Sequence, residues 1–258
     1  LEEKDMSGYV LDLRWNPGGS LQSSIDISRH FIDKGTIVST LTKDGLKDVK
    51  KGTGISLTQK PLVVLVNKGS ASASEIVSGA IKDNKRGKLV GEKTFGKGLV
   101  QNMKPLGDGS AVTLTIAKYL TPNGTDINKF GITPDIKVKM KNNSILFKEI
   151  GTRRDKQYKV GEKELVNKLH IQATTDQLTG IYNRRVIFEA LDEAMDNSKQ
   201  SKDRQFATIM FDIDFFKQVN DNYGHAGGDA VLISFAKLLQ TEISSPNIVG
   251  RIGGEEFL

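Results

Sequence analysis

The stretch PLVVLVNKGSASASEI (61–76) decides the fold of the N-terminal half. It begins with an unbroken apolar run rich in Val and Leu, which is typical of a strand buried on both faces. The part rich in serine and alanine, 69–76, then opens a helical pattern. Another apolar run, GYVLDLRW (8–15), comes earlier, and the apolar spacing over 21–32 predicts a helix between the two runs. Strands that alternate with helices predict an α/β fold with an at least partly parallel sheet.

The composition excludes several classes of protein and of site. With 258 residues, 37% apolar and 26% charged, the chain can bury one large core or two ordinary ones. It has no cysteine, which excludes disulfide scaffolds, thiolate zinc sites and cysteine nucleophiles. Its three histidines lie far apart, which argues against a histidine-based metal site. No apolar run reaches the ~18 residues of a membrane helix, and since the chain begins at Leu1, we expect its natural start to precede it.

The charge is divided unevenly along the chain. The net charge is +6 overall, with +8 over residues 1–150 and −2 over residues 151–258. The lysines are scattered and have no aromatic residues between them on which bases could stack, so we predict no nucleic-acid partner. The asymmetry instead indicates two different modules.

A polar and charged stretch, 139–171, separates the two modules and is predicted to be a linker that ends in a helix. The first module spans 1–138 and the second spans 172–258. In the second, an α/β module too, we expect a helix over 183–199, a buried strand over 206–214, a helix over 230–243 and a hairpin over 249–258.

A serine and a lysine carry the chemistry of the first module. The small residues of 69–76 allow a sharp turn that holds a serine hydroxyl at a helix N-terminus, where an oxyanion is favoured. Without cysteine or a suitably placed histidine, the base can be Lys97, between two glycines, if burial lowers its pKa. Gln101 would face the same side and orient the amine. Residue types alone leave an alternative, in which the serines cap a helix and the lysine is solvated.

Four ordered motifs resemble the carboxyl-terminal processing peptidases, or tail-specific serine proteases. They are LDLRWNPGG (11–19), LVNKGSASASEI (65–76), GEKTFGKGLVQ (91–101) and DINKFGITPDI (126–136). The form of the last motif is closest to the photosynthetic members that trim the photosystem II reaction-centre precursor. The resemblance implies a serine-type endopeptidase that acts on the C-terminal regions of proteins and needs no cofactor.

The same resemblance assigns roles to individual residues. It makes Ser72 the nucleophile, Lys97 the general base and Gln101 the supporting residue. The oxyanion hole would be formed by the backbone N–H groups of Ala73 and of Gly18 or Gly19. Asp83 matches a position where some members have a supporting aspartate, and its alternative role is that of an exposed carboxylate at a helix end.

Carboxylates are placed for a metal ion in the second module. FDIDFFKQVNDNYGHAGGD (211–229) has Asp212 and Asp214 at the end of a predicted strand, and GGEEF (253–257) adds two glutamates on a tight turn. Mg²⁺ takes one or two carboxylates together with phosphate oxygens, and glycines let a phosphate approach the backbone. The alternative for either motif alone is an exposed acidic turn.

Together with DQLTGIYNRR (176–185), these motifs resemble the GGDEF diguanylate cyclases over 172–258. In that family, two domains loaded with GTP face each other as a homodimer and form cyclic di-GMP. The resemblance implies Mg²⁺ held by Asp212, the Ile213 carbonyl and Glu255 or Glu256, with phosphate on Lys217 and guanine on Asn220 and Asp229. The residues of its domain-entry motif, which are more structural than catalytic, are Asp176, Leu178, Thr179, Asn183 and Arg185.

One regulatory feature of that family is altered here. Many GGDEF cyclases bind their product at an inhibitory Arg-x-x-Asp motif, which five residues separate from the signature. Ser244 and Asn247 occupy the arginine and aspartate positions. The resemblance therefore implies a domain that its product does not inhibit through this site.

Two further functions compete with a bacterial peptidase that carries a cyclase module. Both resemblances are partial, because a PDZ domain and an opening strand and helix precede 11–19 in the first family, and the GGDEF domain continues beyond 253–257. The chain can therefore be a chimeric or truncated chain without activity, or its second module can be a GTP-binding regulator. Access to GTP requires the cytoplasm, whereas the peptidase resemblance implies the periplasm or a lumen, so the compartment stays open.

Overall fold

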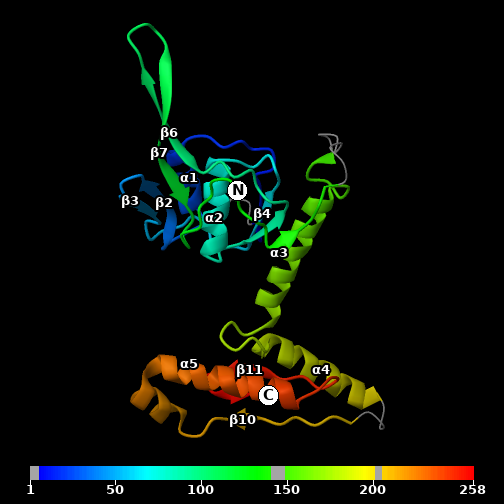
Figure 1. Ribbon diagram of the computed structural model, residues 1–258. Helices are drawn as coiled ribbons and strands as arrows, with labels where there is room; N and C mark the ends of the chain where they lie inside the picture. The colour runs from blue at the N-terminus through cyan, green and yellow to red at the C-terminus, as the bar shows by residue number, and fades with distance from the viewer. Residues whose placement is uncertain (1–5, 141–148, 201–204) are drawn as a thin grey trace. The chain divides into compact units, whose positions relative to one another are not determined.

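The computed structural model describes residues 6–140, 149–200 and 205–258, and it divides the chain into two compact units (Figure 1). The N-terminal unit is Leu1–Asn167 and the C-terminal unit is Lys168–Leu258. Both contain helices and strands, so the α/β fold class predicted from the sequence is confirmed. No helix of the described residues has the length and apolar character needed to cross a membrane.

A four-stranded parallel sheet forms the centre of the N-terminal unit. Its strand order is β1-β4-β5-β8, and every neighbouring pair runs parallel. The strands are β1 (Tyr9–Asp12), β4 (Leu62–Val66), β5 (Lys88–Gly91) and β8 (Ile136–Lys137). The two apolar runs quoted from the sequence are thus adjacent parallel strands, as their composition predicts.

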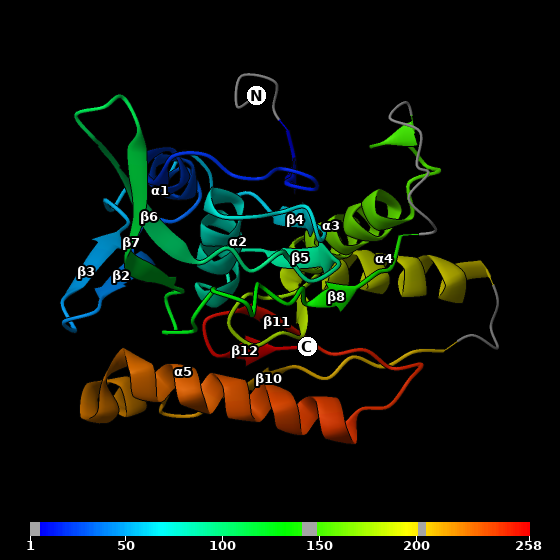
Figure 2. The same cartoon turned by 45° about the horizontal axis from the view of Figure 1, so that its top comes forward.

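Helices cover both faces of this sheet. Val64 and Val66 of β4 pack into a core with α1 (Leu21–Arg29) and α2 (Ala73–Asp83). The alternate residues Val63 and Leu65 pack on the other face with the first half of α3 (Lys156–Thr174). Figure 2 shows α2 beside β4 and β5. Every residue of β4 is therefore buried, and its side chains need no polar face.

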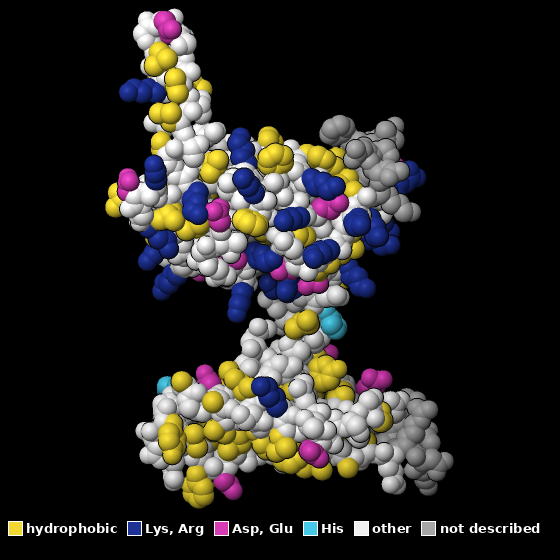
Figure 3. All heavy atoms as spheres, in the orientation of Figure 1, with side chains coloured by type: hydrophobic (Ala, Val, Ile, Leu, Met, Phe, Trp, Pro, Cys, Tyr) yellow, Lys and Arg dark blue, Asp and Glu magenta, His cyan; other side chains and the backbone are white. Residues whose placement is uncertain are grey.

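A second, antiparallel sheet of order β3-β2-β7-β6 completes the unit. Its strands are β2 (Thr36–Thr42), β3 (Lys47–Lys51), β6 (Leu99–Pro105) and β7 (Ala111–Leu120). The far part of the β6–β7 hairpin extends from the unit as a two-stranded arm (Figure 1). On the face drawn in Figure 3, Lys and Arg side chains are spread over this unit rather than gathered in one stripe.

The C-terminal unit packs its helices against a sheet of order β10-β12-β11-β9. The helices are α4 (Arg184–Gln200) and α5 (Phe216–Glu242). The strands are β9 (Tyr182–Asn183), β10 (Phe211–Asp212), β11 (Gly250–Gly253) and β12 (Glu256–Phe257). The predicted hairpin is present, since β11 and β12 pair antiparallel. Phe257 is fully buried at the centre of the core.

Two predicted elements of this unit differ from the structure. The strand predicted over 206–214 is reduced to the two residues of β10, and residues 206–210 are exposed. The physical reason is pairing: β10 has two partners on β12, and among the described residues no strand lies beside 206–210. The helix predicted over 230–243 is the second part of the longer α5, which Gly224 interrupts with φ 73° and ψ 170°.

Candidate active sites

Ser72 stands at the turn between β4 and α2. Its backbone has φ 55° and ψ −117°, a conformation rare for a non-glycine residue, and it turns the chain from strand into helix. As the N-cap of α2 it lies at the positive end of the helix dipole. Its side chain is partly exposed. This is the position that the sequence analysis requires of a nucleophilic serine.

The two neighbouring serines have structural partners. The Ser70 hydroxyl donates to the Leu13 carbonyl oxygen at 2.7 Å. The Ser74 hydroxyl donates to the Asn16 carbonyl oxygen at 3.0 Å. Both serines are buried, so their hydroxyls fasten the serine turn to the segment 13–16, which follows β1. Ser72 is the partly exposed serine of the three.

Gly18 packs directly against this serine turn. It has φ 97°, and a Cβ atom there would lie 2.6 Å from the Ala71 carbonyl oxygen and 2.7 Å from the Ala73 amide nitrogen, so only glycine fits. The Gly18 amide donates to Asn16 Oδ1 at 2.9 Å. Among the described residues, no hydrogen bond is found from the amides of Gly19 and Ala73. Of the two glycines, Gly19 thus has the amide available for an oxyanion.

A buried carboxylate joins the serine segment to the lysine segment. Glu75, which is fully buried, accepts through Oε2 from the amides of Ser72 (2.9 Å) and Lys97 (2.8 Å). Its Oε1 accepts from the Gly96 amide (2.7 Å) and the Thr94 hydroxyl (2.5 Å). Two segments about 20 residues apart in sequence are therefore held on one side chain. The amide nitrogens of the two candidate catalytic residues lie within 3 Å of the same oxygen atom.

Glu75 is not among the site residues predicted from the sequence. The available signal was an acidic residue in the first turn of a helix whose next six residues are small or apolar. An acidic residue is favoured in a first helical turn by the dipole alone, so its position does not reveal the four donors that surround it. Three of those donors come from the distant segment 94–97 and become visible only in the fold.

Lys97 lies on the glycine turn that precedes β6, and its side chain is exposed. Gly96 has φ 92°, and a Cβ atom on Gly98 would collide with the Asn128 backbone, so the segment 127–131 packs closely on this turn. The glycines thus permit the close approach expected from the sequence. The exposed side chain differs from the expectation that Lys97 is buried, because among the described residues none covers it.

The position of Gln101 also differs from the prediction that it faces the same side as Lys97. The strand β6 begins at Leu99, and its register with β7 shifts between Val100 and Gln101. Counting alternate residues from Lys97 therefore does not fix the side on which Gln101 lies. Gln101 is exposed, and within the described part of the chain no hydrogen bond joins it to Lys97.

Asp83 lies at the other end of α2 from Ser72. It is the last residue of that helix, and its carboxylate accepts from the Asn123 amide at 3.0 Å. The structure thus gives Asp83 the role of a helix-end carboxylate that fixes a neighbouring turn, which was the alternative in the sequence analysis.

In the C-terminal unit, two predicted metal ligands face each other across neighbouring strands. Asp212 of β10 and Glu256 of β12 are direct partners in the antiparallel register. Ile213 follows Asp212, and Glu255 is on the turn before β12. Two carboxylates and a carbonyl oxygen are a donor set that suits Mg²⁺, which takes its remaining ligands from water and phosphate. Among the described residues, no group of three or more Asp, Glu or His side chains is placed to hold a metal ion by itself.

The predicted nucleotide residues lie on α5. Asn220 and Asp229 lie on either side of the interruption at Gly224. The Asn220 side chain packs against Gly228 so closely that a Cβ atom on residue 228 would collide with it. The Asn220 side chain therefore lies close to Gly228, the residue before Asp229. Lys217 is in the first turn of α5 and is exposed.

The domain-entry motif is tied to the signature turn. Asp176 accepts from the Thr179 hydroxyl at 2.6 Å and from Arg251 Nη1 at 3.2 Å. Arg251 also donates through Nε and Nη2 to the Gly254 carbonyl oxygen, at 2.9 and 2.7 Å. Burial opposes the charged form of Asp176, but these hydrogen bonds hold its pKa below the ordinary value. The motif thus supports the GGEEF turn.

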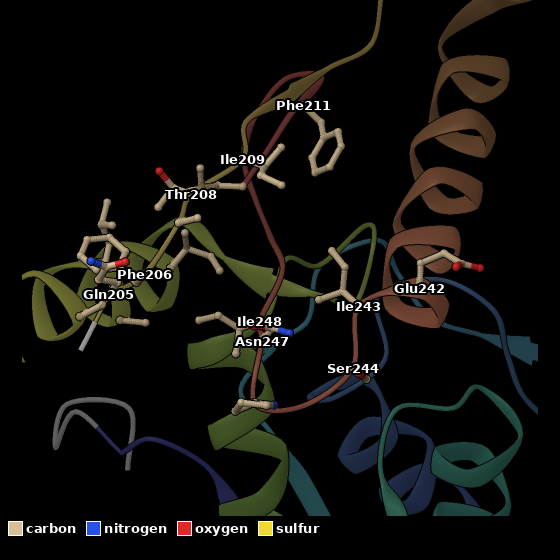
Figure 4. A pocket seen from close by; sticks show the side chains of 17 residues that line it. Gln205, Phe206, Thr208, Ile209, Phe211, Glu242, Ile243, Ser244, Asn247 and Ile248 are labelled. Atoms are coloured by element: carbon tan, nitrogen blue, oxygen red, sulfur yellow. The ribbon is translucent and has the colours of Figure 1, made fainter. Parts of the chain in front are cut away.

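A cavity of about 870 Å³ opens between α4 and the segments 205–211 and 243–248 (Figure 4). Its lining is largely apolar and includes Ser244 and Asn247. None of the predicted metal or nucleotide residues lines it. The cavity is therefore separate from the candidate GTP site.

Comparison with known proteins agrees with both sets of motifs. Residues 1–138 match peptidase family S41, and residues 173–258 match the diguanylate cyclase GGDEF domain. The carboxyl-terminal-processing protease of Synechocystis is 48% identical over 180 residues, which cover 70% of this chain and 39% of that protein. The carboxy-terminal processing protease CtpA of Bacillus subtilis is 48% identical over 141 residues, which cover 54% and 30%.

A solved structure, the photosystem II D1 C-terminal processing protease, is 45% identical with a TM-score of 0.51. The match covers 54% of this chain and 36% of that one. The chain spans well under two thirds of the relatives it matches. These findings confirm both resemblances, and since the first family match covers more than half of the sequence, the chain belongs to peptidase family S41 and carries a GGDEF domain match at its C-terminal end.

Proposed function

We propose that the N-terminal unit is the catalytic part of a serine endopeptidase that cuts in the C-terminal regions of proteins. The observation that carries the proposal is the Glu75 carboxylate, which holds the amides of Ser72 and Lys97 on one oxygen atom. A serine at a strained helix N-cap beside a lysine is an arrangement that can perform acyl transfer without histidine. The 48% identity to carboxyl-terminal-processing proteases supports the substrate class.

In this mechanism, Ser72 attacks the carbonyl carbon of the scissile peptide bond. The neutral amine of Lys97 takes the hydroxyl proton and later delivers it to the leaving amine, and water then hydrolyses the acyl-enzyme with Lys97 again as the base. The amides of Gly19 and Ala73 stabilise the tetrahedral oxyanion. Gln101 orients the amine of Lys97 once the substrate is in place.

Because the side chain of Lys97 is exposed, the bound substrate must be what covers its amine. A neutral lysine needs a covered, poorly solvated amine. A polypeptide bound over the glycine turn 96–98 would exclude water from the amine while bringing the scissile bond to Ser72. Substrate binding and activation of the base are then one event.

A peptide assay tests this proposal. A protein with an unstructured C-terminal tail is incubated with the wild-type chain, and mass spectrometry identifies the products. We expect cleavage within the tail by the wild type and none by Ser72→Ala, because the nucleophile and its base act as a unit. Cleavage by Ser72→Ala at the wild-type rate would exclude this serine.

For the C-terminal unit we propose GTP binding with Mg²⁺, and conversion to cyclic di-GMP when two such units face each other as a homodimer. The pairing of Asp212 with Glu256 supports the metal site, and Glu255 or Glu256 would assist the chemistry. Lys217 would bind phosphate, and Asn220 and Asp229 the guanine edge. Bound Mg²⁺ would supply charge neutralisation for phosphoryl transfer.

A GTP assay separates this function from its alternatives. GTP turnover to cyclic di-GMP supports the cyclase, whereas GTP binding without turnover that changes peptidase rates supports a regulatory module. A folded chain with neither GTP binding nor peptide cleavage is an inactive chimera or truncated chain. Asp212→Asn should abolish Mg²⁺-dependent GTP binding in the first two cases.

A further inference from the structure

Arg14 is completely buried between two parts of the chain that are far apart in sequence. Its guanidinium donates to Asp12 through Nε (2.9 Å) and Nη2 (2.6 Å). It also forms a bidentate pair with Asp155, with Nη1 and Nη2 at 2.9 and 2.6 Å from the two carboxylate oxygens. Nη1 further donates to Gln157 Oε1 at 3.2 Å. All five N–H groups of the guanidinium thus have acceptors.

The carboxylate of Asp155 is itself held in place by burial and by three backbone amides. Its side chain is fully buried. Its Oδ1 accepts from the amides of Gln157 and Tyr158, both at 3.1 Å, which makes Asp155 the cap of α3. Its Oδ2 accepts from the Gly151 amide at 3.1 Å. The carboxylate that holds Arg14 is therefore fixed by the start of a helix and by the loop before it.

Arg14 in turn leads into the turn beside the serine. The next residue, Trp15, has φ 55° and donates its amide to Asn67 Oδ1 at 2.9 Å. Asn16 then accepts from the Gly18 amide and so holds the glycine that packs against Ser72. A displacement of Arg14 would therefore also displace Trp15 and Asn16, and with them the turn that contains the Gly19 amide.

We infer that Asp155 is a positioning residue of the peptidase site, which acts through Arg14 on the turn 15–19. The inference rests on the proposed peptidase function. It places the start of α3, which the sequence analysis assigned to a linker, among the parts that the active site needs. Asp155 lies beyond the residues 1–138 that match the family. The match to the Synechocystis protein is longer than that range and must include residues outside it.

The same helix also has a purely structural contact, which provides a control. Leu165 packs with Tyr158 against Val63 and Leu65 on the face of the sheet away from Ser72. Leu165 is not among the partners of the Arg14 guanidinium in the described part of the chain, which are Asp12, Asp155 and Gln157. Leu165→Ala should therefore loosen the docking of α3 and leave the turn 15–19 in place, whereas Asp155→Asn should disturb that turn.

The experiment compares the wild-type full chain, Asp155→Asn and Leu165→Ala by hydrogen exchange and peptide kinetics. We expect Asp155→Asn to speed amide exchange in residues 13–20, and to lower kcat, each by about tenfold or more with KM changed less than about threefold. Leu165→Ala should lower the unfolding midpoint, read by Trp15 fluorescence, and leave exchange at 13–20 and kcat near wild type. A merely structural role for Asp155 would make the two variants alike.

Each outcome decides the question. The inference is overturned if folded Asp155→Asn exchanges at 13–20 as slowly as Leu165→Ala, or if it retains wild-type kcat. Should Asp155→Asn not fold, Arg14→Lys keeps the charge but loses the planar fork, and the same two readouts apply to it. If the wild-type chain cleaves no peptide, the proposed function fails, while the exchange comparison still decides whether Asp155 positions the turn.

Discussion

Replacing Glu75 with glutamine tests whether this carboxylate holds the two catalytic segments together. Glutamine keeps the shape but exchanges one acceptor oxygen for an NH₂ group, which would then face two N–H or O–H donors. Each oxygen of Glu75 accepts two hydrogen bonds, so an NH₂ group in place of Oε2 loses both, whereas in place of Oε1 it loses the bond from Gly96 and the Thr94 hydroxyl can turn to accept. At about 1.5–3 kcal/mol for each bond to a charged group, the free energy of unfolding of the N-terminal unit should fall by about 1.5–6 kcal/mol.

Urea unfolding followed by tryptophan fluorescence measures this change. Trp15 is the single tryptophan of the chain and belongs to the N-terminal unit, so its signal reports that unit. The matched control is Glu92→Gln, the same change in the lysine segment, on a half-exposed side chain without a hydrogen-bond partner among the described residues. It should cost no more than about 0.5 kcal/mol.

The substitution Glu75→Gln should also affect the rate of peptide cleavage. If the variant stays folded at low temperature, its peptide cleavage should be slower than that of Glu92→Gln, because the amides of Ser72 and Lys97 are no longer held together. An unfolding free energy equal to that of the control, with unchanged cleavage, would refute the bridging role.

Three other predictions concern other parts of the chain. Burial opposes the charge of Asp155, but Arg14 and backbone amides hold its pKa below the ordinary 3.8. The stability that this carboxylate contributes is therefore full above pH 3.8 and is lost as the pH falls below that value. Acid unfolding followed by Trp15 fluorescence should show that the unfolding free energy of Asp155→Asn decreases less steeply with falling pH than that of the wild type. Ser70→Ala should cost about 1–2 kcal/mol of stability and keep kcat within about tenfold, as measured by urea unfolding and peptide kinetics. Calorimetric titration of cyclic di-GMP into a GGDEF domain of full family length should show no tight binding that depends on Ser244 and Asn247.

The fold of the N-terminal unit was largely predictable, because its strands are specified locally. The run 62–66 alternates between two cores, and only a strand between two layers of helices buries every residue. The serine turn was predictable for the same reason, since small residues directly after a buried strand allow it. The C-terminal boundary of the unit was harder to predict. Asp155 belongs to the unit through its ion pair with Arg14, and a pair between residues so far apart leaves no local pattern in the sequence.

Pairing and burial account for what the sequence did not reveal. Residues 206–210 have the composition of a buried strand, but strand formation needs a neighbour, and composition does not supply one. The exposure of Lys97 could not be predicted because glycines at 96 and 98 permit both a covered and an open turn. Glu75 was missed because three of its four donors come from another segment.

The central claim is that Ser72 and Lys97 form one catalytic unit. The most direct measurement is the cleavage of a protein with an unstructured C-terminal tail by the wild-type chain, Ser72→Ala and Lys97→Ala, with the products identified by mass spectrometry and folding checked by Trp15 fluorescence. We predict cleavage in the tail by the wild type and none above background by either folded variant. Cleavage by Lys97→Ala at a near-wild-type rate would contradict the account.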